Sequence, residues 1–469
     1  MKILLVDPPV DQYFSPFKEG PAFALGLLSI DSYLSQNGYS DVVLENFFAC
    51  DQAEIERRLR AAGADLIGLG CTTDSRGFCW RLAKTAKAIN PKVVIVLGNV
   101  HATFFAAEII EHHSVDFCVL GEGEQTMLEL VQALDAGRID CGSIPGLAWR
   151  DPASGKARIN DPRPLLGDLD AIGINPKRRL FVNERGKRQG NMMSSRGCPF
   201  ACGFCSSSSF WGRTWRKRKP ERVVEEFQML VDQGAEVIDL LDDLFTMDQP
   251  RAEAICDLLI ARGNQTPWFA RARVDCISES LVDKMIAAGC EEISFGIESG
   301  DPEMIKRINK KIDLEQAVEV FQMLRRKKLV ARANFMVGNP GETAATVQAS
   351  IQLARRMNPT SIIASVARVY PRTMLDVEAR KYGLVKPEFW YLETGEVPYY
   401  TVDMTFAEMQ GHATNMLYQW SIHRGFWTLI KMAYLNWKIS GTRRSLSFIF
   451  NWMRNALPHG RSAARNAAK

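Results

Sequence analysis

Three cysteines lie close together, at the spacing Cys-x-x-x-Cys-x-x-Cys, in a segment rich in Gly and Pro: Cys198, Cys202 and Cys205. Thiolates are soft ligands, so this spacing favours a transition metal over a hydrophobic core. A structural zinc site needs four protein ligands, but no His, Asp or Glu follows in the serine run at 206–209. Iron–sulfur cubanes are commonly held by four cysteines, and three would leave one iron open to a substrate or cofactor. A zinc ion with a remote fourth ligand, and buried thiols without a metal, remain as alternatives.

This segment resembles the cluster-binding signature of the radical S-adenosylmethionine (SAM) enzymes. The match includes Phe204, the aromatic residue directly before the third cysteine. The resemblance implies a 4Fe–4S cluster on the three cysteines, with the amino and carboxylate groups of SAM at the open iron. It also implies that an electron from the cluster cleaves SAM to a 5′-deoxyadenosyl radical, and that an external donor of the flavodoxin or ferredoxin type supplies the electron.

Length and composition describe a multidomain globular protein. A chain of 469 residues is expected to form two or three domains, and a net charge of only +4 gives no reason to expect a nucleic-acid partner. The first seven residues do not read as a signal peptide, and no apolar run approaches the length of a membrane span. Eleven cysteines without a secreted-type framework favour the reducing cytoplasm.

The N-terminal third, residues 1–140, alternates short apolar runs with helical stretches. The runs lie at 3–6, 41–44, 66–70, 93–98 and 117–121, which predicts a Rossmann-like doubly wound parallel sheet. Ligands of such sheets bind beyond the carboxyl ends of the strands. Because Pro8 and Pro9 stand where a dinucleotide-binding turn would need glycines, a dinucleotide is not expected.

Glycines and polar residues gather at the predicted strand ends of this sheet. Taken alone, they are equally well explained as ordinary strand-to-helix turns. Beside the cysteine loop, however, the turns at 98–103 and 121–124 resemble those of the cobalamin-binding domain that precedes many radical SAM cores. An Asp-x-His-x-x-Gly motif is absent, so the resemblance implies cobalamin without a protein histidine on cobalt, and His101 at the nucleotide tail or corrin edge. The cobalamin contacts implied by the resemblance are Pro9, Thr72, Thr73, Gly98, Asn99, His101, Thr103, Gly121, Glu122, Gly123 and Glu124.

A second series of strands and helices begins near residue 191. Strands are predicted at 191–195, 237–241, 268–272, 292–297, 330–337 and 361–369, each but the last followed by a helical stretch. Such units form a partial TIM-type barrel over 191–375, whose chemistry gathers at the carboxyl ends of the strands. The segment 141–190, broken by prolines, is predicted to be a hairpin-bearing linker.

Charged and polar residues follow the strands of the predicted barrel. An arginine fork suits the carboxylate of SAM, and a strand-end glutamate accepts hydrogen bonds from hydroxyls or an ammonium. By the resemblance, Arg271 or Arg273 would hold the carboxylate, and Glu298 and Ser299 would contact the ribose or the amino acid end. The alternative for each is an ion pair within the barrel. The full set of predicted SAM contacts is Phe204, Asp242, Arg271, Arg273, Glu298, Ser299 and Asn339.

The C-terminal region, residues 376–469, is predicted to be helical, at 406–422 and again at 426–453. We expect these helices to cap the mouth of the barrel. The alternative is peripheral contact with a membrane, because the second stretch places three tryptophans among Lys and Arg. The basic runs at 177–188 and 213–219 are expected to be solvated surface rather than the rim of an anionic substrate site.

The resemblance implies a cobalamin-dependent methyltransferase. The adenosyl radical would take hydrogen from an unactivated carbon of a small molecule, a lipid, tetrapyrrole or natural product, and methylcobalamin would deliver the methyl group. One alternative is an anaerobic oxidative cyclase of tetrapyrrole biosynthesis, which shares the layout but inserts oxygen. A second is a non-catalytic cobalamin sensor with a structural cluster.

Overall fold

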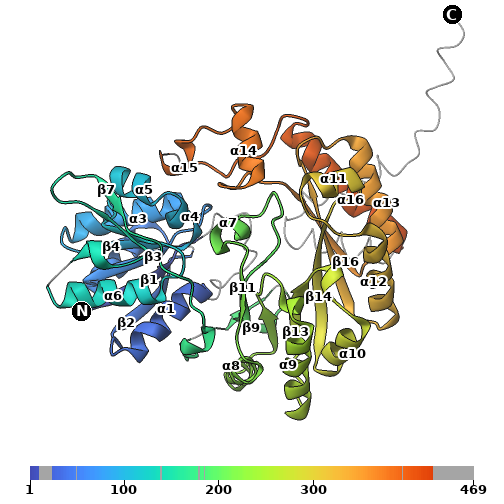
Figure 1. Cartoon of the computed structure of the whole chain (residues 1–469), viewed down its shortest axis with the longest axis horizontal. Helices are drawn as coiled ribbons and strands as arrows, with labels where there is room; N and C mark the ends of the chain where they lie inside the picture. Colours follow the sequence, from blue (N-terminus) through green and yellow to red (C-terminus); the bar gives the residue numbers. More distant parts are fainter. Residues whose placement is uncertain are drawn as a thin grey trace, which may run out of the picture.

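A computed structural model describes residues 1–425 except 10–23, 49, 138–139, 178–179, 184 and 393. The helix predicted at 426–453 and the tail after it lie outside the described residues. Figure 1 shows two α/β halves beside each other, with the N-terminal half in blue and the barrel in green to orange. In the described part of the chain, no helix is both long and apolar enough to cross a bilayer.

The N-terminal half is the doubly wound sheet that the alternation of apolar strands and helices predicts. Its strands are β1 (Ile3–Asp7), β2 (Val42–Asn46), β3 (Leu66–Gly70), β4 (Val94–Gly98), β5 (Phe117–Val119), β6 (Leu147–Arg150) and β7 (Ala157–Ile159). The order in the sheet is β2-β1-β3-β4-β5-β6-β7, and the first five strands are parallel. Because helices cover both faces, β1 is buried along almost its whole length.

Among the described residues, six helices flank this sheet. They are α1 (Leu25–Gln36), α2 (Gln52–Ala62), α3 (Arg76–Ile89), α4 (Asn99–Phe104), α5 (Ala106–His112) and α6 (Glu124–Asp135). Helices α1 and α6 share one apolar cluster with the sheet, and α2, α3 and α5 share the other. The hairpin predicted in the linker is β6–β7, and it extends the sheet because β6 pairs antiparallel with β5.

The second half is a curled sheet with the order β16-β15-β14-β13-β12-β9-β8. The strands are β8 (Phe181–Val182), β9 (Arg188–Met192), β12 (Val237–Leu240), β13 (Trp268–Ala272), β14 (Cys290–Glu298), β15 (Val330–Val337) and β16 (Ser361–Val366). All but β8 are parallel, so the six predicted barrel strands are present. The first lies three residues earlier than predicted, because the backbone after Met192 leaves the sheet to form a separate hairpin.

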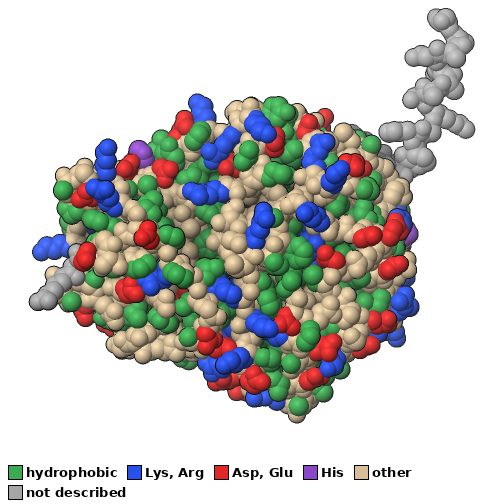
Figure 2. All heavy atoms as spheres, in the orientation of Figure 1, with side chains coloured by type: hydrophobic (Ala, Val, Ile, Leu, Met, Phe, Trp, Pro, Cys, Tyr) green, Lys and Arg blue, Asp and Glu red, His purple; other side chains and the backbone are tan. Residues whose placement is uncertain are grey.

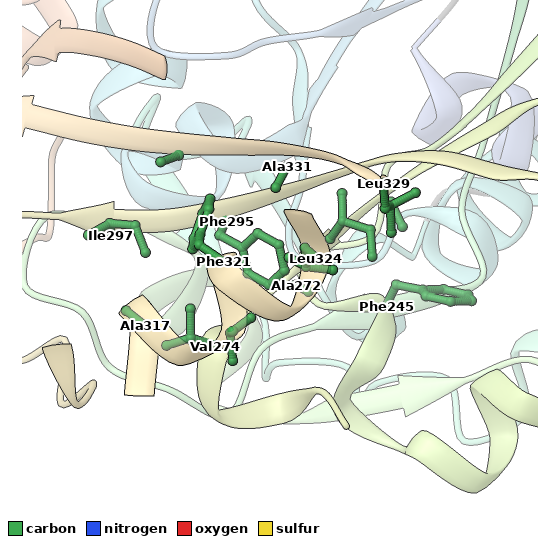
Figure 3. Close-up of a cluster of buried hydrophobic side chains, with 14 of the residues drawn as sticks. Phe245, Ala272, Val274, Phe295, Ile297, Ala317, Phe321, Leu324, Leu329 and Ala331 are labelled. Atoms are coloured by element: carbon green, nitrogen blue, oxygen red, sulfur yellow. The ribbon is translucent and has the colours of Figure 1, made fainter. Parts of the chain in front are cut away.

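Helices cover the convex side of the curled sheet. They are α8 (Pro220–Asp232), α9 (Gln249–Ala261), α10 (Glu279–Ala287), α11 (Pro302–Arg307), α12 (Leu314–Arg326) and α13 (Ala344–Met357). Figure 3 shows how alternate strand residues, such as Phe295 and Ala331, pack against Phe321 and Leu324 of α12. The sheet and these helices thus share one apolar core.

The residues that alternate with this core are largely polar and face the concave side of the sheet. Arg271 of β13 pairs with Asp239 of β12 at 2.8 Å, and Asn334 of β15 donates to Ser294 of β14 at 2.9 Å. A TIM barrel is normally filled by bulky aliphatic residues at these positions. The concave side is therefore lined for a polar ligand rather than packed as a core.

The described part of the C-terminal region differs from the expected cap. Helix α16 (Phe406–Arg424) packs along the edge strand β16 and against α13, and Trp420 donates to the carbonyl oxygen of Pro359 at 3.3 Å. It covers an exposed sheet edge. The preceding segment, with α14 (Met374–Lys381) and α15 (Phe389–Leu392), crosses to the N-terminal half (Figure 1), where Trp390 is fully buried among its core residues.

Candidate active site

The cysteine loop connects the two strands of an antiparallel hairpin, β10 (Ser195–Gly197) and β11 (Trp215–Lys217). Gly197 opens the loop with a φ of 88°, and a Cβ there would overlap the carbonyl oxygen of Thr214. Only glycine adopts this conformation without strain. Helix α7 (Ser207–Trp211) follows the third cysteine and lies between the two halves (Figure 1).

Two segments far away in the sequence hold the cysteine loop in place. The backbone N–H of Gly203 donates to Ile308 O at 2.7 Å, and the side chain of Asn309 donates to Ala201 O at 2.6 Å. On the other side, Leu375 N–H donates to Gly203 O at 3.2 Å. The residues after α11 and the start of α14 therefore position the loop.

The three cysteines are half-buried free thiols. Burial raises the pKa of Cys198, and it raises that of Cys205 to about 11. Among the described residues, no three His, Cys, Asp or Glu side chains converge as they would on one ion. In a cubane each cysteine binds a different iron, so a loop with three cysteines supplies three of the four iron ligands. A loop with three accessible thiols fits a 4Fe–4S cluster.

Two of the predicted SAM contacts present buried donors without a partner. Arg273 is bound to Asp275 at 2.9 Å and stacks on Phe200 at 3.6 Å, yet its Nη1 has no hydrogen-bond partner. Asn339 is 1% exposed, and its Nδ2 also has none. Buried donors without acceptors are rare in folded proteins. The two donors thus suit the acceptor groups of a bound ligand such as SAM.

Glu298, at the end of β14, has a φ of 68°, which is uncommon for a residue other than glycine. Its carboxylate pairs with the buried ammonium of Lys310 at 3.1 Å. That ammonium also lies 5.9 Å from the ring of Phe204, in the cysteine loop. The lysine links a predicted SAM contact to the cluster-binding segment.

The other predicted SAM contacts are engaged within the protein. Arg271 binds Asp239 and also donates to Leu240 O at 2.7 Å. Asp242 is fully buried and accepts hydrogen bonds from Ser194 N at 2.6 Å and from Ser195 Oγ at 2.6 Å. In the structure, Asp242 supports the strand that leads to the cysteines. Ser299 is also fully buried, with its Oγ 3.4 Å from that of Ser350.

A cavity of about 480 Å³ lies at the carboxyl ends of β1, β3, β4 and β5. Its wall is mostly apolar, and backbone comes close where Gly68 and Gly123 line it. A Cβ at Gly68 would lie 2.8 Å from Leu5, so the sheet surface there is open only because the residue is glycine. The pocket lies where ligands of doubly wound sheets bind, and its apolar wall suits part of a large cofactor such as cobalamin. The predicted cobalamin contacts that line it are Gly98, Asn99, Gly121, Glu122, Gly123 and Glu124.

His101 does not reach this cavity. It is completely buried, with Nε2 2.9 Å from Trp390 O and Nδ1 3.4 Å from Thr73 Oγ1. Burial, with a smaller contribution from the charge of Arg76, lowers the pKa of His101 to about 3. The structure corrects the expected cofactor contact: both ring nitrogens are used by protein atoms, and the ring joins the N-terminal half to α15.

The remaining predicted cobalamin contacts, Pro9, Thr72, Thr73 and Thr103, are also absent from the cavity wall. Thr103 accepts from Gly121 N at 3.0 Å and donates to Asn99 O at 2.9 Å, and so holds two turns of the wall together. Thr103 thus supports the wall, whereas Thr72 is bonded to Ser75 and Thr73 to His101.

Glu122 and Glu124 meet the hairpin that carries the cysteines. Arg196 of β10 binds Glu122 at 2.6 Å and Glu124 at 2.8 Å, and Arg216 of β11 binds Glu122 at 2.7 Å. Burial raises the pKa of Glu124, but the charge of Arg196 together with the hydrogen bonds from Arg196 and Ser29 outweighs burial, so the pKa is lowered. The sequence offered one signal for Arg196, its place two residues before Cys198, but nothing that pairs it with residues seventy positions away.

Comparison with known proteins agrees with this geometry. Residues 192–354 match the model of the radical SAM superfamily, and residues 19–131 match that of the B12 binding domain. An uncharacterised methyltransferase of Pyrococcus horikoshii is 34% identical over 82% of this chain and 87% of its own length. The anaerobic magnesium-protoporphyrin IX monomethyl ester cyclase of Rubrivivax gelatinosus is 33% identical over 70% of this chain and 61% of its own.

A solved structure has the same fold. The radical SAM methyltransferase TsrM from Kitasatospora setae, solved with cobalamin and a 4Fe–4S cluster bound, superposes with a TM-score of 0.70 at 19% identity, covering 81% of this chain and 75% of TsrM. The fold class and the family predicted from the cysteine loop are thereby confirmed. The chain belongs to the cobalamin-binding radical SAM enzymes, is of the methyltransferase class, and has a 4Fe–4S cluster, SAM and cobalamin as its cofactors.

Proposed function

We propose that this enzyme adds a methyl group to an unactivated carbon of a small molecule. The observation that carries the proposal is a shared wall: Ser195 and Arg196, which lead into the cysteine loop, also line the cavity of the cobalamin-type sheet. When bound, the cluster and SAM supply a carbon-centred radical oxidant, and cobalamin supplies a methyl carrier. The role of the chain is to supply position, and this is supported by the hairpin that carries the cysteines also lining the cavity.

Within this proposal, Cys198, Cys202 and Cys205 bind the cluster. Arg273 offers Nη1 to the SAM carboxylate, and Asn339 offers Nδ2 to another acceptor of SAM. These roles are supported by the two donors being buried and without partners. Glu298 accepts from the SAM amino group or ribose, and Lys310 holds its carboxylate. Arg271, Asp242 and Ser299 act as supports of the site.

We propose that the methyl acceptor is a polar natural product rather than a lipid. The concave side of the barrel is lined by paired charges and amides, and the side chain of Arg271 remains 40% exposed there although it is bound to Asp239. Glu292, nearer the amino ends of the strands, binds both Arg185 and Arg332. An apolar substrate would displace water from these polar groups and offer them no hydrogen bonds in return, which is unfavourable.

The reaction type is tested by product mass. Purified enzyme with reconstituted cluster and cobalamin is incubated anaerobically with SAM, a reductant and polar extract of the source cells. A product heavier by one CH₂, labelled when the SAM methyl group is labelled, is expected. A gain of oxygen or a ring closure would favour the cyclase alternative, to which the 33% identical relative gives weight.

The sensor alternative is tested without a substrate. Reduced enzyme is expected to release 5′-deoxyadenosine from SAM, and Cys202→Ala is expected to abolish this release.

We propose a flavodoxin- or ferredoxin-type protein as the electron donor. All eleven cysteines are free thiols, which supports a reducing cytoplasmic location. On the face seen in Figure 2, basic and acidic side chains are interspersed, which gives no support to a nucleic-acid partner.

We also propose functional units at 1–140 for cobalamin, 191–375 for the cluster and SAM, and 376–469 as a helical unit, with 141–190 as their connection. The covering of each sheet by its own helices supports the first two units.

A further inference from the structure

An ionic network joins the cobalamin-side cavity to the strand that carries the cluster ligands. It consists of Ser29, Glu122, Glu124, Arg196 and Arg216, which we call the hairpin network. All four of its charged side chains are largely buried, with 15% or less of each exposed. It lies where the turn at 121–124 faces the cavity on one side and the β10–β11 hairpin on the other.

The hairpin depends on an acid from the other half of the molecule. Arg196 and Arg216 are directly opposite each other in the β10–β11 pairing. Like charges at such positions repel. Glu122 lies between them, binding Arg196 through one carboxylate oxygen and Arg216 through the other. The second oxygen also accepts from Leu166 N at 2.7 Å. One carboxylate therefore neutralises the two facing charges on the strands between which all three cysteines lie.

Arg196 and Arg216 use their guanidinium groups differently. Arg196 spans two acids, with Nη1 on Glu122 and Nη2 on Glu124, and Nη2 also donates to Ser29 of α1 at 2.9 Å. Arg216 uses a single nitrogen, Nη1, for both Glu122 and Leu166 O. A two-armed contact fixes orientation as well as distance, and a lysine cannot reproduce it. Arg196 is thus tied to α1, to the turn and to the start of α6.

We propose that the hairpin network positions the cobalamin-binding half relative to the cluster. Arg196 and Glu122 are its central positioning residues, and they act through Gly197 and Cys198 on one side and through Gly121 and Gly123 on the other. This inference rests on the proposed function only in assuming that both cofactors serve one reaction. It predicts that breaking the network changes the distance between the cofactors while leaving the cluster bound.

Glu122→Gln is the direct test, in the full chain reconstituted with cluster and cobalamin. The variant keeps its shape and one acceptor oxygen but loses the charge between the two arginines. We expect iron and sulfide contents per chain equal to those of the wild type. Because Glu122 also lines the cavity, only protein that holds cobalamin is compared. We expect the magnetic interaction between the reduced cluster and cob(II)alamin, seen by electron paramagnetic resonance, to weaken or broaden.

Two products of SAM give a second readout. Release of 5′-deoxyadenosine reports cleavage at the cluster, and release of S-adenosylhomocysteine in the presence of reduced cobalamin reports methyl donation. In Glu122→Gln we expect the ratio of S-adenosylhomocysteine to 5′-deoxyadenosine to fall by about tenfold to a hundredfold, because a misplacement of about 1 Å can cost a factor of about 100 in rate. A role in stability alone would lower both products together.

Matched variants make the test specific. Glu129→Gln carries the same change on α6, in an ion pair with Arg163 outside the cavity wall, and is expected to behave as the wild type. Arg196→Lys is expected to lower the ratio more than Arg216→Lys, because only Arg196 uses two nitrogens. If Glu122→Gln does not fold, the comparison of Arg196→Lys with Arg216→Lys tests the positioning role of the network.

The inference is overturned if fully loaded Glu122→Gln and Arg196→Lys show the magnetic interaction and the product ratio of the wild type. A wild-type enzyme that releases no S-adenosylhomocysteine would instead count against the proposed methyl transfer, and the magnetic measurement would still judge the network.

Discussion

His101→Gln separates a packing role from a cofactor role at one residue. In the structure the imidazole is fully buried, 2.9 Å from Trp390 O and 5.0 Å from the ring of Phe105. A glutamine amide can still donate to Trp390 O, but it carries no titratable group. The substitution therefore removes the proton equilibrium of this site while keeping its main hydrogen bond.

The magnitude follows from the pKa of His101, which burial lowers to about 3. An unfolded histidine has a pKa near 6.5, so the unfolded chain binds this proton first as the pH falls. Stability from this group is complete above about pH 6.5 and is lost as the pH decreases toward 3. At about pH 5.5 the loss is RT ln 11, or about 1.4 kcal/mol, relative to about pH 8.

The assay compares the free energy of unfolding of the wild type and His101→Gln in urea, at both pH values, with near-ultraviolet circular dichroism as the probe. Loss of ring packing is expected to cost the variant about 1–3 kcal/mol at about pH 8. The difference in free energy of unfolding between the two proteins is expected to shrink by about 1.4 kcal/mol at about pH 5.5. The reason is that only the wild type loses stability when the unfolded chain protonates this histidine. Other groups, such as Asp7, titrate in both proteins and cancel in the difference.

Cobalamin content tests whether His101 has a cofactor role. A packing role predicts that His101→Gln retains the wild-type amount of corrinoid after anaerobic reconstitution at neutral pH. A folded variant that loses the corrinoid, or a deficit that is the same at both pH values, would refute the assignment of His101 to packing.

Three further predictions concern the barrel half. Cys202→Ala should lose most iron and sulfide and release no 5′-deoxyadenosine; full iron content would argue against the cluster assignment. Gly300→Ala should destabilise by about 3 kcal/mol in urea, because its Cβ would lie 2.6 Å from the backbone of α13, whereas Gly411→Ala, with open space around it, should not. Burial raises the pKa of Glu342 to about 7, so the stability of the wild type should fall by about 3 kcal/mol as the pH rises from about 4.5 to 7. Glu342→Gln should remove this dependence of stability on pH. An unchanged pH dependence would assign the titration to another group.

Local patterns were sufficient to predict the two sheets and the cysteine loop. The strand at 66–70 and the helix at 76–89 were predicted at their observed bounds, because burial on both faces makes a strand apolar throughout and a helix amphipathic. Where prediction and structure differ, tertiary contacts decide. The chain after Met192 leaves the sheet because Ser195–Gly197 pairs with Trp215–Lys217, a pairing that no periodicity reveals.

Side-chain partners across the two halves were beyond what the sequence could predict. The turn at 121–124 was correctly expected at a strand end, and it lines the cavity. Its glutamates were expected to contact the cofactor, and in the structure they also bind the arginines of the cysteine hairpin. A motif identifies which backbone turns surround a ligand, but a charge within that turn is free to serve a partner that only the folded chain brings near.

The same reasoning gives His101 and Glu122 opposite meanings although both stand in motif turns of one sheet. His101 points to the face covered by α15. Both of its ring nitrogens lie against protein atoms there, Trp390 O and Thr73 Oγ1. Glu122 points to the edge where the second half docks, so its charge reaches the residues that precede Cys198. In a doubly wound sheet the carboxyl edge is where one domain meets another as well as where ligands bind. In this enzyme, therefore, a polar residue of a cofactor motif has to be judged by the face it occupies: those on the docking edge govern how far apart the two cofactors stand.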